Sequence, residues 1–331
     1  MKTITKTLRV HQAILGIMVI LTAFATPMSA AAQAAPRKLL AALKGPFDLA
    51  GERTSKVQYF WMETQFVNIG FDGKRTGIVR YSAKLKCVPA PISGKGGDEY
   101  TCREFQLRIG EGEAVTIPSL AGWSYVFNMG TGMDEKGQVF GIPHSKFENI
   151  ADSRGNKLPP VIRYAVYNNF IDFHAFNDAF ARPTAGGQGI QDLKSMGQKI
   201  VHAAAFTAPP VNLGSGIKEG SFFRNGEVTL VFKGLSTVDG AACAIVGFDS
   251  GESTLKMIMP LAEDKEVVTT GGSEYIGDLY IDLVTYWLRK VTLDEFVVTQ
   301  TTVPGPMPKT DAYTIRHLLM RLISQEEFER N

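Results

Sequence analysis

Few side chains in this sequence combine the type and the spacing that metal-dependent chemistry requires. Outside the N-terminal region the histidines are His144, His174, His202 and His317, and none has a second histidine four residues away. Asp172 and His174 could supply two ligands, but no third ligand stands out by spacing, and a zinc site needs three or four. We therefore expect no metal site and no cofactor.

Ser250 and His202 suggest a nucleophile and its base. Such chemistry needs the base within hydrogen-bond reach of the nucleophile and a third group that orients the base. The interval between the two residues leaves little chain for the sheet and the aspartate that would have to lie between them. A turn at 249–251 that joins a strand over 241–248 to a strand over 255–259 explains the segment with fewer assumptions.

Glu274, Asp278 and Asp282 are the remaining candidates for acid–base chemistry. On a strand they would share one face and lie ~6–7 Å apart per two residues, which is compatible with a carboxylate pair. A solvated polar face gives the same pattern. We therefore predict no catalytic residue, and a non-enzymatic role is the favoured hypothesis.

An aromatic stripe is the most informative pattern in the middle of the chain. Its members, together with Val166, recur at steps of three and four residues, which predicts one face of a helix: Phe170, Phe173, Phe176 and Phe180. Packing against a sheet would explain this face. The functional alternative is the apolar wall of a groove, where small ligands often bind. The candidate ligand-binding residues are then Tyr167, Phe170, Phe173 and Phe176.

Cys87 and Cys102 bracket a loop rich in proline and glycine between two predicted strands. In an oxidising compartment this arrangement predicts a disulfide, worth ~3 kcal/mol in a disputed chain-entropy account. However, Cys87 alternates with the apolar residues of its strand, whereas Cys102 alternates with polar ones. A β-bulge would place both on one face. The alternative is two unpaired thiols, and Cys243 is expected to be an inert core residue.

The elements that must position these residues are mostly strands. Period-two alternation predicts strands over 78–87 and 103–109 in the first part of the chain. In the last third it predicts strands over 228–233, 278–283 and 296–301, and 241–248 is apolar on both faces, as in a central strand. Short helices are expected over 35–43 and 191–196.

Together these elements predict an α+β protein that is predominantly antiparallel β, with two strand-rich blocks around a helical middle segment. The predicted blocks are 35–158 and 198–305, and the helical segment is 159–197. A linker and an amphipathic C-terminal helix are predicted over 306–331, because an apolar stripe recurs there at helical spacing: Ile315, Leu318, Leu319, Leu322 and Ile323.

The N-terminal 34 residues predict export. Three basic residues (Lys2, Lys6 and Arg9) precede an apolar stretch over 13–24, and small residues follow up to Ala34. This order is typical of a secretory signal peptide, cleaved after Ala34 or a few residues earlier. The apolar stretch is shorter than the ~20 residues of a membrane-spanning helix, and no later segment is long and apolar enough to span. We expect a periplasmic or extracellular location.

Net charge excludes one class of partner. Removal of the signal peptide leaves 32 basic and 33 acidic residues, a net charge of about −1, which provides no basic surface for nucleic acid. The leading hypothesis is an exported envelope protein that binds an apolar small molecule or another envelope protein. A hydrolase with a dispersed site is one alternative. A structural or assembly module, whose sign would be a flat exposed apolar patch, is another.

Overall fold

The computed structural model describes residues 46–70, 72–129, 138–184, 188–204, 206–207, 213, 216–262, 265–306 and 309–330. The signal peptide predicted for residues 1–34 and the short helix predicted for 35–43 lie outside the described residues. All described residues belong to one compact unit, Lys44–Asn331. In this described part, no helix combines the length and the apolar character needed to cross a membrane.

Antiparallel strands dominate the fold. The strands are β1 (Gln58–Ile69), β2 (Arg75–Val88), β3 (Glu99–Ile109), β4 (Val115–Thr116), β5 (Trp123–Val126), β6 (Gln138–Val139), β7 (Ile142–Pro143), β8 (Lys199–His202), β9 (Phe206–Thr207), β10 (Phe222–Arg224), β11 (Val228–Val238), β12 (Ala241–Asp249), β13 (Thr254–Ala262), β14 (Lys265–Asp282), β15 (Leu288–Thr302) and β16 (Thr310–Ile323). The α-helices are α2 (Ala90–Ser93), α3 (Pro160–His174) and α4 (Gln325–Glu329). Short helices of other types are η1 (Pro118–Leu120), η2 (His144–Lys146), η3 (Ala175–Phe180) and η4 (Ile190–Asp192).

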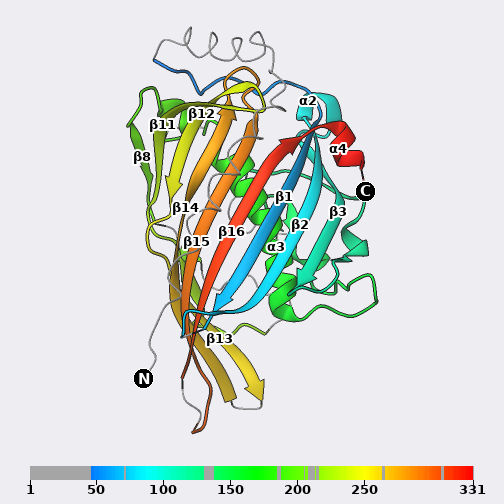
Figure 1. The fold of residues 1–331 in the computed structure, drawn as a ribbon, viewed down its shortest axis with the longest axis vertical. Helices are drawn as coiled ribbons and strands as arrows, with labels where there is room; N and C mark the ends of the chain where they lie inside the picture. Colours follow the sequence, from blue (N-terminus) through cyan, green and yellow to red (C-terminus); the bar gives the residue numbers. More distant parts are fainter. Residues whose placement is uncertain are drawn as a thin grey trace, which may run out of the picture. The chain divides into compact units, whose positions relative to one another are not determined.

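One large open sheet contains most of these strands (Figure 1). Its strand order is β4-β3-β2-β1-β16-β15-β14-β12-β11-β8. In addition, β13 pairs with the N-terminal part of β14, and β5 pairs with β3. The predominantly antiparallel β character predicted from the sequence is confirmed. The strands do not form two separate blocks as predicted. Strands from both parts of the chain belong to one sheet, in which β1 and β16 are direct neighbours.

The C-terminal helix predicted from the apolar stripe is wrong. Residues 310–323 form β16, a central strand between β1 and β15, and the one helix that follows is the short α4. In β16 the buried positions alternate as Arg316, Leu318 and Met320. Because a charged residue begins that buried row, its period of two was masked and the helical spacing of the leucines and isoleucines dominated the pattern.

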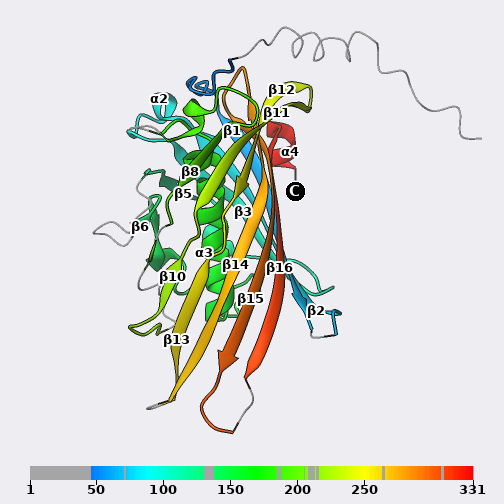
Figure 2. The same cartoon turned by 90° about the vertical axis from the view of Figure 1, so that its left-hand side faces the viewer.

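Helix α3 lies against one face of the sheet (Figure 2). It begins with Pro160 at its first position, which suits the fixed backbone angle of proline. The helix predicted from the aromatic stripe is confirmed, and it continues as the π-helix η3 to Phe180. Of the second predicted helix, over 191–196, only the 3₁₀ turn η4 is present.

Aromatic rings join α3 to the elements on both of its sides. Phe173 contacts Phe60 of β1 with ring centroids 5.2 Å apart, and Phe170 stacks on Phe105 of β3 at 5.7 Å. On its other side Phe170 meets Trp123 at 5.4 Å and Phe147 at 5.5 Å. The core is therefore a layer of aromatic side chains that fills the space between the sheet, helix α3 and the segments 117–129 and 138–158.

Candidate functional site

A pocket of about 460 Å³ lies between chain segments that are far apart in the sequence. It is bounded by the extended segment 49–55 before β1, by α2, by the turn 181–183 after η3 and by the β14–β15 turn. Apolar side chains that line it include Leu49, Ile190, Ile281 and Trp287. The charged side chains that line it are Glu52, Arg53, Asp98 and Arg182. A small-molecule site usually combines apolar walls with a few polar groups; this pocket has both, and its accessible lining is more polar than apolar.

The backbone around the pocket is tightly constrained. Tyr286 has a φ of 58°, a left-handed conformation that bulky residues rarely adopt. A Cβ added to Gly51 would lie 2.0 Å from the Tyr286 ring, so only glycine allows this approach of segment 49–55 to the β14–β15 turn. Sparsely populated backbone conformations cluster at functional sites, where the surrounding structure holds them.

Asp178 is the centre of a buried polar cluster next to the pocket. Its side chain is fully buried. Oδ1 accepts a hydrogen bond from Arg53 Nη1 at 2.9 Å and forms an ion pair with Arg182 Nη2, also at 2.9 Å. Oδ2 accepts from His174 Nδ1 at 2.7 Å, and the Tyr100 hydroxyl lies 3.1–3.2 Å from the two oxygens. One carboxylate thus joins the segment before β1, strand β3, helix α3 and the turn after η3.

The π-helix explains how these groups come together. His174, Asp178 and Arg182 follow one another at four-residue steps, and the wider turn of η3 brings Asn177 and Asp178 to the same buried side. Asn177 donates from Nδ2 to the Tyr100 hydroxyl at 3.1 Å. Single π-helical turns of this kind are rare and occur frequently at functional sites.

The two arginines next to Asp178 differ in their hydrogen bonds and in their exposure. Arg53 also donates from Nε to the Tyr286 carbonyl at 3.3 Å and from Nη2 to the Asn177 carbonyl, and its guanidinium lies 4.5 Å from the Trp287 ring centroid. Arg182 donates from Nη2 to Asp98 and forms an ion pair with Asp178. The Arg182 side chain is 24% exposed, against 9% for Arg53, so Arg182 is the more accessible of the two.

A second chain of hydrogen bonds leads from Asp178 into the core. His174 Nε2 lies 2.7 Å from the Tyr125 hydroxyl, so a proton on Nδ1 lets Nε2 accept from Tyr125. His174 is fully buried and Tyr125 is 7% exposed. A tyrosine, a histidine and an aspartate in series resemble a nucleophile, base and orienting group. However, neither Tyr125 nor His174 lines the pocket beside Asp178, and both are buried, so we interpret them as structural.

Burial and pairing set the charges of the cluster. Burial disfavours the charged form of Asp178, but Arg182, His174 and Arg53 outweigh it and hold the pKa of this carboxyl well below its usual range. Burial lowers the pKa of His174, which stays neutral despite Asp178. Burial also raises the pKa of Tyr100 well above its ordinary value. The cluster therefore holds two guanidinium ions and the Asp178 and Asp98 carboxylates.

The ligand-binding residues predicted from the aromatic stripe lie together, but inside the core. Tyr167, Phe170, Phe173 and Phe176 are each at most 2% exposed. Phe176 packs on Phe248 of β12 with ring centroids 5.0 Å apart. None of the four lines the 460 Å³ pocket. Their contacts match the packing interpretation, and a direct role for them in ligand binding stays a prediction.

The predicted disulfide is absent from the structure. All three cysteines lie among the described residues, and all three are free and buried. The expected β-bulge is present: Lys84 pairs with Glu104 and Leu85 with Cys102, so the chain at Arg103 bulges and Cys102 turns to the buried face. Cys87 pairs with Tyr100, which leaves the two thiols diagonal rather than opposite. Burial raises the pKa of Cys102 to about 12.

The other sequence candidates do not converge. Ser250 is buried, donates to the Gly251 carbonyl at 2.8 Å and accepts from the Tyr275 amide, in the predicted turn between β12 and β13. Asp278 pairs with Lys233, and Asp282 pairs with Arg289 and caps the β14–β15 turn. Among the described residues there is no group of three or more potential metal ligands.

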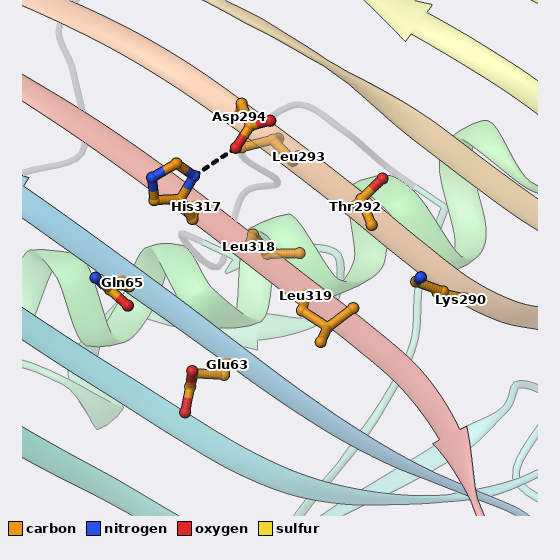
Figure 3. Close-up of a pocket in the computed structure, with 9 residues that line it drawn as sticks. All are labelled: Glu63, Gln65, Lys290, Thr292, Leu293, Asp294, His317, Leu318 and Leu319. Carbon is orange, nitrogen blue, oxygen red and sulfur yellow. Dashed lines mark hydrogen bonds and ion pairs between the residues drawn. The ribbon is translucent and has the colours of Figure 1, made fainter. Parts of the chain in front are cut away.

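A second hollow, of about 330 Å³, lies on the sheet face opposite α3 (Figure 3). Its lining comes from β1, β15 and β16, and it contains the His317–Asp294 pair. Both side chains of this pair are more than half exposed. With one histidine and no enclosed wall of apolar residues, this hollow offers less for specific binding than the pocket beside Asp178.

Sequence reasoning missed the charged residues of the site. The four-residue spacing of His174, Asp178 and Arg182 was a visible signal, because it places ionisable groups on a helix that is otherwise aromatic. Arg53 and Asp98 gave no such signal. Neither belongs to a periodic pattern, and only the fold brings Arg53 to Asp178 and Asp98 to Arg182.

Comparisons with known proteins add no identity. No protein-family model matches the sequence, and no curated protein matches it. Among solved structures, the chain is similar to OmpT, an outer membrane protein of Vibrio cholerae, at 10% identity and a TM-score of 0.17, over 81% of this chain and 99% of that one. It is also similar to a DUF1329 family protein from Desulfovibrio piger, at 11% identity and a TM-score of 0.13, over 83% and 91%. An anion-selective porin from Comamonas acidovorans gives 9% identity and a TM-score of 0.16, over 82% and 100%. TM-scores this low support no conclusion about fold or function.

Proposed function

We propose that this chain is an exported envelope protein that binds a small molecule, without catalysis, in the pocket between segment 49–55 and the turn 181–183. The order of basic, apolar and small residues over 1–34 supports export. The observation that carries the binding role is the pocket itself, about 460 Å³ in volume, with Leu49, Ile281 and Trp287 among its walls. Pockets of ~300–1,000 Å³ are usual for small ligands.

The aromatic core supports this location over the interior of the sheet. Phe170 and Phe173 contact rings on both the sheet and the covering loops, so an apolar ligand there would have to displace packed side chains. Displacing well-packed aromatic residues costs several kcal/mol each, on the order of 3–5. The pocket beside Asp178 requires no such rearrangement.

The buried relay argues against a hydrolytic role for the most enzyme-like residues. A nucleophile has to reach its substrate, and a general base has to lie within hydrogen-bond reach of the proton that it takes. Tyr125 and His174 are enclosed by aromatic rings, with Phe127 stacked on His174 at 4.8 Å. Their contacts suit the task of orienting Asp178 and, through it, the arginines of the pocket.

The test uses N-phenyl-1-naphthylamine, an uncharged apolar dye that fluoresces when it leaves water. We expect the mature protein to bind it, and Ala50→Gln, which extends an uncharged side chain from the pocket lining, to weaken binding about tenfold. Ala312→Gln, at an exposed alanine of β16, is the matched control and should bind as the parent does. Equal binding by both variants, or no binding by the parent, would contradict the proposal.

A further inference from the structure

Resting on the binding role proposed above, we infer that the pocket selects an amphipathic molecule with an oxyanion head, such as a carboxylate, sulfonate or phosphate, and that Arg182 binds this head. The inference starts from the hydrogen bonds of the two arginines. A guanidinium has five N–H donors, and a buried donor without an acceptor is costly.

Arg53 has a partner for each of its nitrogens. Nη1 donates to Asp178 at 2.9 Å, Nε to the Tyr286 carbonyl at 3.3 Å, and Nη2 to the carbonyls of Asn177 and Ala181. These bonds fix segment 49–55 against the turn after η3 and against the β14–β15 turn. Arg53 therefore shapes the pocket and has little left to offer a ligand.

Arg182 has N–H donors that lack an acceptor in the described part of the chain. Its hydrogen bond to Asp98 and its ion pair with Asp178 both use Nη2, and its Nε is buried without a hydrogen-bond partner among the described residues. To the extent that the structure describes the chain, Nη1 also has no acceptor. This guanidinium lines the pocket and is partly accessible, so it is the group to which a bound oxyanion would add hydrogen bonds. Arginine is well suited to carboxylate and phosphate groups because its donors form a planar fork.

Net charge does not select the oxyanion, because Arg53 and Arg182 face three negative groups, Glu52, Asp98 and Asp178; the selection rests on the unused N–H donors of Arg182. Asp178 is a single negative charge between Arg53 and Arg182, so these three groups leave one positive charge. Asp98 balances it from the wall of the pocket, where it also accepts a hydrogen bond from the Ala90 amide at 2.8 Å. Asp98 thus already provides a negative charge to Arg182, next to the place proposed for the ligand head. Repulsion between Asp98 and an oxyanion should weaken the binding of that oxyanion.

The walls supply the apolar part of the ligand's site. The apolar lining that a ligand could cover is Ala50, Pro91 and Pro183, which are exposed, and Tyr286, which is partly exposed, whereas Leu49, Ile281 and Trp287 are at most 1% exposed. A ligand with its head at Arg182 would place its apolar body against the four accessible side chains. A free inorganic anion would leave them uncovered and would gain only the interaction with Arg182.

The experiment compares two dyes that differ in a single group. 1-Anilinonaphthalene-8-sulfonate carries a sulfonate that the uncharged N-phenyl-1-naphthylamine lacks. We expect the parent protein to bind the sulfonate dye about tenfold more tightly, since a charge-assisted hydrogen bond contributes that much or more. Arg182→Gln should abolish this preference and keep binding of the uncharged dye. Asp98→Asn should increase the preference, a change in the direction opposite to that of a merely destabilising substitution.

The outcomes separate this inference from the proposed function. If the parent binds both dyes equally, or if Asp98→Asn leaves the preference unchanged, Arg182 does not bind an oxyanion. The proposed binding of a small molecule in this pocket would then still hold. If neither dye binds, the binding role fails as well. Competitors then decide the ligand class: decanoate should displace the sulfonate dye, whereas inorganic sulfate at matched ionic strength should not. Displacement by sulfate alone would overturn the amphipathic part of the inference.

Discussion

At the scale of single residues, Asp178 holds the polar cluster together. It is fully buried and forms ion pairs with both Arg53 and Arg182. Buried charges are tolerated only when they are paired, and the removal of one partner leaves the others uncompensated. The cluster is therefore both the wall of the pocket and a point on which four chain segments depend.

The first prediction concerns this carboxylate. Asp178→Asn should lower the free energy of unfolding by about 3–5 kcal/mol, because it leaves two guanidinium ions with one acceptor charge fewer in a buried place. Urea unfolding followed by circular dichroism measures this loss. Asp72→Asn, at an exposed aspartate paired with Lys74, is the control and should leave the urea midpoint unchanged. A small loss in Asp178→Asn would mean that the arginines are solvated.

The second prediction concerns pH. Burial lowers the pKa of His174 in the folded protein, so below about pH 6.5 the unfolded chain binds a proton there that the folded chain does not. This contribution to stability is complete above that pH and is lost as the pH falls. The lowered pKa of Asp178 acts in the same direction at more acidic pH, while the raised pKa of Asp172 opposes both.

The comparison of variants isolates the histidine. His174→Gln should reduce the difference in urea midpoint between pH 7.5 and pH 5 relative to the parent. His202→Gln, at a partly exposed histidine of β8, should retain the parent's difference. If His174→Gln keeps the full difference, protonation of another group causes the pH dependence.

The third prediction concerns the cysteines. Because Cys87, Cys102 and Cys243 are each 0% exposed and unpaired, none should react quickly with a thiol reagent in the native protein. After unfolding without reductant, three thiols per chain should react. A count of one would show that Cys87 and Cys102 are joined after all, as their loop and compartment suggest from the sequence.

At the scale of elements, helix α3 and its π-helical extension connect the core to the pocket. The same stretch carries the aromatic face at 166–176 and the ionisable residues at its C-terminal end. It is tied to the sheet by polar contacts too: Asn169 accepts from Thr64 at 2.7 Å, and Asp172 pairs with Arg316 at 2.5 Å. Changes in the aromatic packing should therefore unfold the protein rather than alter the pocket alone.

The fourth prediction compares two phenylalanines. Phe173→Ala should cost about 3–5 kcal/mol, the usual range for a fully buried phenylalanine. Phe296→Ala, at a side chain of β15 that is 54% exposed, should stay within about 0.5 kcal/mol of the parent. Urea midpoints of the two variants give the comparison. A small loss of unfolding free energy in Phe173→Ala would refute the place of Phe173 in the core. It would instead support the hypothesis of a ligand groove along the aromatic stripe.

The elements also show where sequence patterns succeed. Strands with one apolar face, such as β2, and the aromatic helix were predicted because a single periodicity ran through each of them. β16 was missed because Arg316 occupies a buried position and pairs there with Asp172 and Glu295, which are distant in the sequence. The pairing of a charge on α3 with charges on two strands cannot be read from any one of the three segments.

At the scale of the whole unit, the sheet brings its first strand and its last strand together. β1 pairs with β16, so segment 49–55 before β1 reaches the β14–β15 turn and forms one wall of the pocket. The sequence predicted the strands but not this pairing, because local periodicity carries no information on partners. The pocket depends on that pairing, and for this reason the candidate site could not be located from the sequence.

The sheet face opposite α3 carries an exposed apolar patch, the feature expected of an assembly module. Its members lie on neighbouring strands at paired positions, with Val298 opposite Tyr313. Ile276, Phe296 and Val298 are 46%, 54% and 50% exposed. An apolar probe has two possible places to bind, this patch and the pocket, and the central claim depends on which of the two it occupies.

Photo-crosslinking with a diazirine-bearing fatty acid, followed by peptide mapping, locates the binding place directly. The proposed function predicts crosslinks within 49–55, 181–183 or 286–287, and predicts that an excess of decanoate removes them. Crosslinks concentrated on β14 to β16 around Phe296, with none on the three pocket segments, would contradict the claim that this pocket is the ligand site.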